Sequence, residues 1–187
     1  MIGWIAAWEA CWWLAQRGDR ARGYRRALAA ARRRKKPLLI VGICDGEYGH
    51  GQPDRGDVVV DLRPEIVARR QGIPNYVRAN VEDLARFGDR HFGACFCSFT
   101  LSHCCDARRA LAELRRVADE TVIVEARWWR LSSYLVPGRA WVVAGDRAVR
   151  LPWARRCNAP TRYGTARPTA FGAVILPSSE IAGTLRL

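Results

Sequence analysis

Two stretches, LLIVGICDG at residues 38–46 and GDVVVDLRP at residues 56–64, decide how this chain folds. Each contains a continuous apolar run, which is typical of a strand buried on both faces within a parallel sheet. The glycines and Pro53 between the two runs predict a loop over most of that interval. Pro64 suits the first turn of a helix, so we expect a short helix at residues 65–71.

The same alternation continues along the chain. Further strands are predicted at residues 75–78, 94–98 and 121–125. Asp106 is a good N-cap for a helix over residues 107–117, where apolar residues recur at the three-four spacing of one buried face. Strands that alternate with helices predict an α/β fold with a doubly wound, mostly parallel sheet and right-handed crossovers.

The pattern changes after residue 130. Residues 140–143 and 148–151 flank Gly145-Asp146 and predict a β hairpin, and residues 170–176 are a candidate for one more strand of the sheet. We therefore expect three parts. They are an N-terminal segment at residues 1–36, a domain at residues 37–150 and a C-terminal extension at residues 151–187.

The composition narrows the class of protein. A chain of 187 residues that is 49% apolar fits one compact domain with additions, and excludes a disordered chain or a disulfide-stapled miniature. Seven cysteines with no C-x-x-C pair indicate reduced thiols in the cytoplasm. Five potential metal ligands lie within eleven residues of one another and form a candidate metal site: Cys95, Cys97, His103, Cys104 and Cys105. We predict no metal there, because zinc sites usually need two spaced pairs, and a thiol in a strand packs as a small hydrophobe.

The first sixteen residues, MIGWIAAWEACWWLAQ, predict a helix with a tryptophan stripe, since Trp4, Trp8 and Trp12 share one face. At about 1.5 Å per residue the segment reaches only about 24 Å, less than a hydrocarbon core of about 30 Å. Its positive charges follow the apolar run, whereas those of a signal peptide precede it. Tryptophan prefers the headgroup region of a membrane.

Residues 17–36 hold ten Arg and Lys against one acid, Asp19, and so supply +9 of the net charge of +13. Such a block is attracted to anionic lipid or to nucleic acid. We favour an anionic membrane surface bound through residues 1–36, because only Tyr24 interleaves the basic residues as base stacking would require. The alternative is a helix that caps the core of the domain or forms a dimer contact. The location predicted is cytoplasmic and membrane-associated.

Candidate binding residues follow the predicted strands. In a doubly wound sheet a ligand binds at the carboxyl ends of the strands, where the strand order reverses. Gly42 and Gly46 allow a tight turn and close backbone approach, and Asp61 is placed to accept both hydroxyls of a ribose. Asn80 and the backbone beside it could read the edge of an adenine. A nicotinamide site is disfavoured, because G-x-G-x-x-G would need glycines at Cys44 and Glu47.

Five stretches together resemble the class I S-adenosylmethionine-dependent methyltransferases. They are LLIVGICDG, GDVVVDLRP, YVRANVEDLARF (residues 76–87), FGACFCSFTLSHC (residues 92–104) and ALAELRRVADETVIVE (residues 110–125). The resemblance covers about residues 37–126 and implies a Rossmann-like fold with S-adenosyl-L-methionine as cofactor. This chain departs from the family pattern at Cys44, where glycine is preferred, at Asn80, where an acid is common, and at residues 47–57, where a loop replaces most of the first helix.

The resemblance also implies roles for individual residues. Gly42, Cys44 and Gly46 would lie against the amino-acid part of the cofactor, Asp61 on its ribose, Asn80 and Val81 on its adenine, and Ser98 beside the sulfonium. His103 is the candidate general base, with a structural role at the helix start as the alternative. The function expected is methyl transfer to a small-molecule or lipid-like acceptor, and the alternative is a catalytically inactive binding or scaffold module tethered to a membrane.

Overall fold

The computed structural model describes residues 2–42, 56–70, 72–73, 75–128, 132–135, 139–144 and 147–152. Residues 1–155 form one compact unit, to which all of these belong. The candidate strand at residues 170–176 lies outside the described part of the chain. Cys44 and Gly46 lie outside it as well.

The core of the unit is a five-stranded parallel sheet in the order β3-β2-β1-β4-β5. Its strands are β1 (Leu38–Val41), β2 (Val58–Asp61), β3 (Tyr76–Arg78), β4 (Ala94–Ser98) and β5 (Thr121–Val124). All five predicted strands are present, and their ends differ from the prediction by at most one residue. The order reverses between β1 and β4, as the predicted doubly wound, Rossmann-like fold requires.

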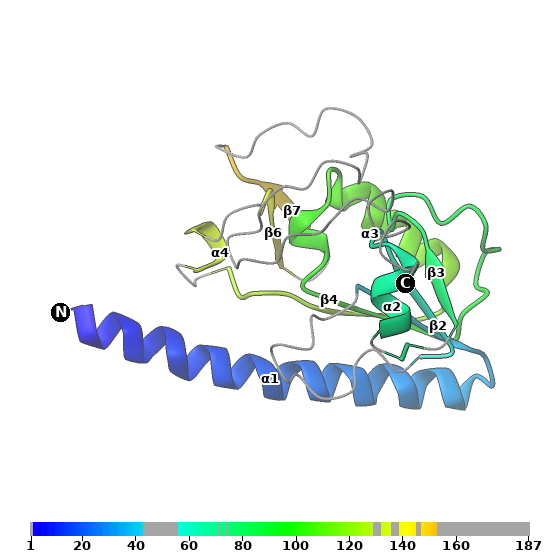
Figure 1. Cartoon of the computed structure of the whole chain (residues 1–187), viewed down its shortest axis with the longest axis horizontal. Helices are drawn as coiled ribbons and strands as arrows, with labels where there is room; N and C mark the ends of the chain where they lie inside the picture. The colour runs from blue at the N-terminus through cyan, green and yellow to red at the C-terminus, as the bar shows by residue number, and fades with distance from the viewer. Residues whose placement is uncertain are drawn as a thin grey trace, which may run out of the picture. The chain divides into compact units, whose positions relative to one another are not determined.

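Both faces of the sheet are covered by helices (Figure 1). Helix α3 (Ala107–Val117) packs on the face that carries Leu39 and Val41. Its start is capped as predicted, since the Asp106 carboxylate accepts hydrogen bonds from the backbone N–H groups of residues 108 and 109 at 3.0 and 3.1 Å. Helix α2 (Glu65–Arg70) lies on the opposite face, where Ala68 joins the cluster around Leu38 and Ile40.

Helix α1 (Ile2–Arg33) covers most of that opposite face. Ala27, Ala30 and Ala31 are fully buried, and the ring of Tyr24 meets the ring of Phe96 edge-on at 6.0 Å between centroids. The sequence analysis places residues 17–36 in an N-terminal segment, with a helix that caps the core as the alternative to membrane binding. In the structure, small residues between the arginines let the second half of the helix pack directly on the sheet.

The direction of α1 determines which half of the helix lies beyond the carboxyl ends of the strands and which half lies at their amino ends. Ala31 contacts Gly93 at the amino end of β4, Gly23 contacts Val124 at the carboxyl end of β5, and Asp19 pairs with Arg127 after β5 at 3.5 Å. The helix therefore runs from the side of the sheet where the strands have their carboxyl ends (the carboxyl edge) to the side where they have their amino ends (the amino edge). Its first half, which carries the tryptophans, extends past the carboxyl edge (Figure 1).

The predicted hairpin is present, formed by β6 (Trp141–Ala144) and β7 (Arg147–Arg150), which pair antiparallel. Trp141 Nε1 donates to the carbonyl oxygen of Cys104 at 3.0 Å and joins the hairpin to the segment after β4. That segment contains a 3₁₀ helix, η2 (Leu101–His103). A short helix α4 (Ser132–Leu135), which the sequence did not predict, precedes the hairpin.

The contact between α1 and the sheet makes a matched pair of glycine variants informative. A Cβ at Gly23 would lie 2.7 Å from Val124 Cγ2 and 3.0 Å from Phe96 Cε2, whereas at Gly18 it would meet only the flexible end of Arg22. We expect Gly18→Ala to raise the free energy of unfolding by up to about 1 kcal/mol through helix propensity. Gly23→Ala should lower it by roughly 1–2 kcal/mol, because overpacking outweighs the same gain.

Urea denaturation of the full chain measures the free energy of unfolding of both variants. Equal stabilisation by the two alanines would contradict the packing of α1 on the sheet.

Candidate active site

Three of the predicted site residues form one row across the sheet at its point of strand reversal. Val41 pairs in register with Val60 on one side and with Cys97 on the other, so Gly42 stands between Asp61 and Ser98. The Gly42 N–H donates to the Val60 carbonyl at 2.9 Å, which continues the pairing by one residue. Because neighbouring strands lie about 4.8 Å apart, Asp61 and Ser98 directly flank the turn after β1.

Gly42 has a positive φ of 88°, a conformation that favours glycine. A Cβ there would collide with Thr100 Oγ1. The Thr100 hydroxyl lies 3.3 Å from the Val41 carbonyl oxygen and 3.2 Å from that of Ser98, and so it bridges the ends of β1 and β4. The absence of a side chain at Gly42 thus serves the packing of Thr100, a residue that the sequence did not single out.

Asp61 is half-buried at the end of β2. Its Oδ1 accepts a hydrogen bond from the Arg63 N–H at 2.9 Å, so part of the carboxylate holds the turn that leads into α2. The Tyr76 hydroxyl supports the same turn by donating to the Arg63 carbonyl at 2.6 Å. Burial, followed by the nearby Asp61, raises the pKa of Tyr76 well above its usual range. Asp61 is therefore held in place by its neighbours at the edge where a ligand was predicted.

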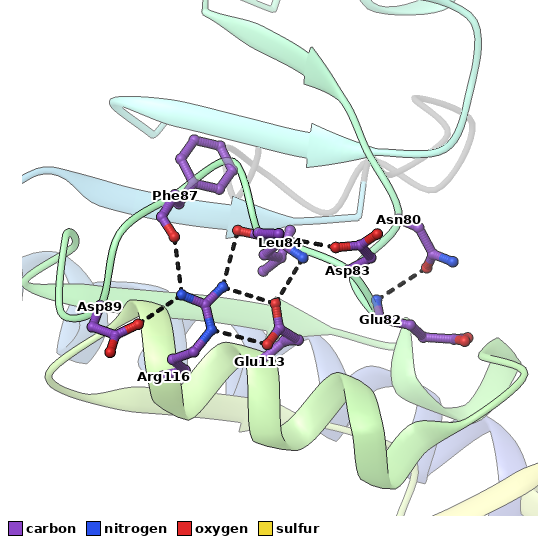
Figure 2. Close-up of polar contacts among 9 residues, drawn as sticks. Asn80, Glu82, Asp83, Leu84, Phe87, Asp89, Glu113 and Arg116 are labelled. Atoms are coloured by element: carbon purple, nitrogen blue, oxygen red, sulfur yellow. Dashed lines mark hydrogen bonds and ion pairs between the residues drawn. The ribbon is translucent and has the colours of Figure 1, made fainter.

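Asn80 and Val81 follow β3 in a tight turn, and Figure 2 shows Asn80 at its start. The Asn80 side-chain oxygen accepts from the Glu82 N–H at 3.0 Å, which leaves its amide donors for other partners. Val81 is buried in the core beneath α3. Glu82 reaches the segment after β4, where its Oε1 accepts from the Cys105 N–H at 2.6 Å. This bond joins two of the predicted ligand-binding loops.

The loop after β3 is anchored to α3 by a polar network that the sequence analysis missed (Figure 2). The Arg116 guanidinium donates to the carbonyl oxygens of Leu84 and Phe87 at 3.1 and 3.0 Å. It also pairs with Asp89 at 2.8 Å and with both oxygens of Glu113 at 2.9 Å. Hydrogen bonding from Arg116 holds the pKa of Glu113 below its usual value. Glu113 in turn accepts from the Leu84 N–H at 2.8 Å.

A second group of polar atoms lies at the carboxyl ends of β4 and β5. The hydroxyl oxygens of Ser98 and Ser102 and Oε2 of Glu125 are buried, and none has a hydrogen-bond partner within the described residues. The other Glu125 oxygen accepts from the Leu101 N–H at 2.8 Å. The Ser102 hydroxyl lies near enough to lower the pKa of Glu125 but does not reach hydrogen-bond geometry. Burial dominates and raises the pKa of Glu125 to about 7.

His103 is exposed at the end of η2, on the same side of the sheet as the row at Gly42. Its backbone N–H donates to the Thr100 carbonyl at 3.0 Å, so the bridge at Thr100 also positions the histidine segment. The imidazole is therefore carried on the solvent side of the predicted site.

The cysteines of β4 are core residues. Cys95 and Cys97 are both fully buried on the α3 face, as expected for thiols that pack as small hydrophobes. Burial raises the pKa of Cys95 to about 12 and that of Cys97 well above its usual value. Among the residues that the structure describes, no three His, Cys, Asp or Glu side chains gather as a metal site would need.

The sequence of the sheet region matches a known family model. Residues 39–123, from β1 to β5, match the model described as a methyltransferase domain. Residues 39–123 are thus similar to this family of methyltransferase domains. S-adenosylmethionine is the cofactor that the family implies, in agreement with the resemblance seen in the sequence. The comparison with curated proteins found no match.

Several solved structures are similar to parts of the chain. The YcgJ protein from Bacillus subtilis is 25% identical over 43% of this chain and 38% of that chain, with a TM-score of 0.34. An S-adenosylmethionine-dependent methyltransferase from Aquifex aeolicus is 23% identical over 43% of this chain and 50% of that chain, with a TM-score of 0.32. Another, from Mesorhizobium loti, is 20% identical over 61% of this chain and 56% of that chain, with a TM-score of 0.36. The chain thus spans roughly half the length of these structures or less. With TM-scores this low, the match to the family model is what identifies the domain.

One buried polar atom in the described part of this domain is suited to bind a polar ligand. The buried Ser98 hydroxyl has no partner there, although it stands beside Gly42 at the strand reversal. Such an orphaned polar atom costs free energy unless a ligand or water satisfies it. Asp61 and Asn80, on the neighbouring strands, supply the carboxylate and amide groups that would complete the site.

The raised pKa of Glu125 yields a prediction about stability. Its pKa in the folded chain, about 7, is above the usual value of 4.5, so the folded state favours the protonated acid. The stabilisation is fully present below pH 4.5 and is lost as the pH rises through 7. Glu125→Gln should therefore stabilise the chain more at pH 8 than at pH 5, by a difference of roughly 2 kcal/mol in the free energy of unfolding.

Urea denaturation at the two pH values measures this difference. Glu113→Gln is the matched control, because the pKa of Glu113 is shifted in the opposite direction and its loss should give no gain at pH 8. Equal effects of Glu125→Gln at pH 5 and pH 8 would contradict the assignment.

Proposed function

We propose that this chain transfers a methyl group from S-adenosylmethionine to an acceptor at the cytoplasmic face of a membrane. The observation that carries the proposal is the single row of Gly42, Asp61 and Ser98 at the strand reversal of a methyltransferase domain. The activity, the acceptor and the membrane location are all parts of the proposal.

The side chains in and beside the row are chemically suited to bind different parts of the cofactor. Asp61 would accept hydrogen bonds from the ribose hydroxyls, and the Asn80 amide and the backbone beside it would face the adenine. Ser98 would lie beside the reacting centre. When bound, the cofactor supplies an electrophilic methyl group, so the protein's contribution is mainly alignment of the acceptor. His103, exposed on η2, would take the acceptor's proton where the acceptor carries one.

The first half of α1 supports the membrane location. Trp4 and Trp8 are 83% and 56% exposed, although tryptophan is usually buried to a large extent. Exposed tryptophan beside arginine suits the headgroup region of an anionic bilayer. This half extends past the carboxyl edge of the sheet, the edge that carries the cofactor residues, so a bilayer bound there would face the proposed site. None of the described helices has both the length and the apolar character needed to cross a membrane.

An acceptor that reaches the site from such a surface would be a lipid, a quinone or an envelope glycan. The described residues bring aromatic side chains to this region, including Trp128, which is 56% exposed after β5. Trp141 is instead buried and fixes the hairpin.

Calorimetry with S-adenosylmethionine and S-adenosylhomocysteine tests the cofactor site. Asp61→Asn keeps the oxygen that accepts from Arg63 but removes the charge, so we expect a folded protein that binds either ligand about 1–3 kcal/mol more weakly. Asp106→Asn is the control, since asparagine is an equally good N-cap and should leave binding unchanged. Absence of binding by the folded, unsubstituted chain would favour the inactive scaffold module instead.

Co-sedimentation with lipid vesicles tests the membrane location. We expect the full chain to sediment with vesicles that contain 30% phosphatidylserine and to remain in solution with pure phosphatidylcholine. The double variant Trp4→Gln/Trp8→Gln should lower the bound fraction at least fivefold, while Trp128→Gln should not. Binding of RNA with a steep salt dependence, without binding of anionic vesicles, would show that the basic segment serves nucleic acid.

A further inference from the structure

The 3₁₀ helix η2 links the end of β4 to two other parts of the described domain. Just before it, the Thr100 hydroxyl bridges the ends of β1 and β4. The Ser102 carbonyl oxygen accepts a hydrogen bond from the Ala140 N–H at 2.8 Å, and the Cys104 carbonyl oxygen accepts one from Trp141 Nε1 at 3.0 Å. A movement of η2 would therefore change both the predicted site and the position of the β6–β7 hairpin.

A side chain at the end of β5 holds the start of η2. Oε1 of Glu125, the residue after β5, accepts a hydrogen bond from the Leu101 N–H at 2.8 Å. The first N–H groups of a helix have no partner within the helix itself. Thr100 stands at the N-cap position, but its side chain makes no cap bond to η2. Glu125 therefore supplies the cap that Thr100 does not.

The surroundings of Glu125 oppose a negative charge. Its Oε2 and the nearby Ser102 hydroxyl are both buried, and neither has a hydrogen-bond partner within the described residues. The N–H groups of η2 and Arg139, before β6, favour the ionised carboxylate, but burial outweighs them and raises the pKa of Glu125 to about 7. Cys97 of β4 also lies near the carboxyl group, and burial keeps this thiol neutral by raising its own pKa.

We propose that the Glu125 carboxyl group is a pH-sensitive latch, which caps η2 when it is protonated and turns toward solvent and releases η2 when it is ionised. Glu125 as a whole is only half-buried although its Oε2 is covered, so the side chain has a short route to water. A buried carboxylate is costly, and hydration relieves that cost only if the bond to Leu101 is given up. Release would loosen the bonds from η2 to the hairpin.

This proposal does not rest on methyl transfer, since it concerns only contacts among described residues. It couples pH near neutrality to the segment that carries Thr100 and His103. The contrary possibility is a static cap, in which Glu125 changes charge without moving η2.

An NMR titration of the full-length chain between pH 5.5 and pH 8.5 is the first test. We expect the Glu125 carboxyl carbon, the Leu101 amide and the Trp141 indole N–H to titrate with one common midpoint near pH 7. A Glu125 midpoint outside this range, or a Trp141 signal that does not share it, would overturn the latch.

Nitrogen-15 relaxation of the same sample is the second test. At pH 5.5 the Leu101 amide should have an order parameter of about 0.85, which should fall below about 0.6 at pH 8.5. The Cys95 amide is the internal control, because it is bonded to the Glu120 carbonyl oxygen at 2.8 Å between the same two strands but at their amino ends. An unchanged value at Leu101, or an equal fall at both amides, would contradict a local release of η2.

Two glutamine variants identify the group responsible. Histidine ordinarily changes charge in the same pH range, so His103 on η2 needs its own variant. His103→Gln should leave the common midpoint in place. Glu125→Gln keeps an oxygen that can cap η2 but has no charge, so it should abolish the response of Leu101 and Trp141.

A response that is lost in His103→Gln, or retained in Glu125→Gln, would overturn the assignment to Glu125. The carboxyl carbon of Glu125 in the unsubstituted chain keeps the test decisive if a variant fails to fold.

Discussion

The structure depends on one requirement of parallel sheets, which is that both faces must be covered. Helix α3 covers one face with Leu111, Leu114 and Val117 besides two alanines, while the fully buried residues of α1 on the other face are alanines. Because Ala27, Ala30 and Ala31 have short side chains, the helix axis lies close to the sheet, and at Gly23 the backbone itself meets Val124 and Phe96. This close contact fixes the position of a helix that is otherwise rich in arginine. It also fixes where the unpacked half of that helix extends.

The carboxyl edge of the sheet is organised by backbone register rather than by direct contacts among the site residues. Gly42, Asp61 and Ser98 are neighbours because their strands pair one-for-one. The loops around them are then held by side chains from elsewhere, namely Thr100 over Gly42, Tyr76 beneath the turn at Asp61, and Glu82 against Cys105. The residues expected to meet a ligand are thus positioned by residues that need not touch it.

The sequence predicted the sheet well, because four of the five strands are short, mainly apolar runs followed by turn residues. The packing of α1 on the sheet was hard to predict, because its fully buried residues there are alanines, which carry little hydrophobic signal beside ten basic residues. The network of Arg116 was also missed. Its partners at Leu84, Phe87 and Asp89 lie 27 to 32 residues away along the chain, and no local pattern predicts which carbonyls a guanidinium will reach. Glu125 was visible only as the last residue of a strand, since its burial depends on η2.

The charge of α1 has two different environments, and the difference bears on function. Toward the amino edge of the sheet, Lys36 pairs with Asp119 at 2.7 Å, Arg34 with Glu120 at 3.2 Å and Arg32 with Asp57 at 3.5 Å. Asp119 and Glu120 directly precede β5 and Asp57 precedes β2, so the basic residues near the end of the helix serve the fold. Exposed ion pairs contribute little stability individually, but several at one edge help to orient the helix.

Past the carboxyl edge the helix has a different surface. There the large apolar side chains of Trp4 and Trp8 are exposed, and Arg127 lies over the ring of Trp12 at 5.9 Å. A helix needed only as a layer of the fold could end where the sheet ends, near Asp19. Its extension by more than four further turns, with an aromatic surface on the side of the predicted cofactor residues, is accounted for if that surface meets the environment from which the proposed acceptor comes.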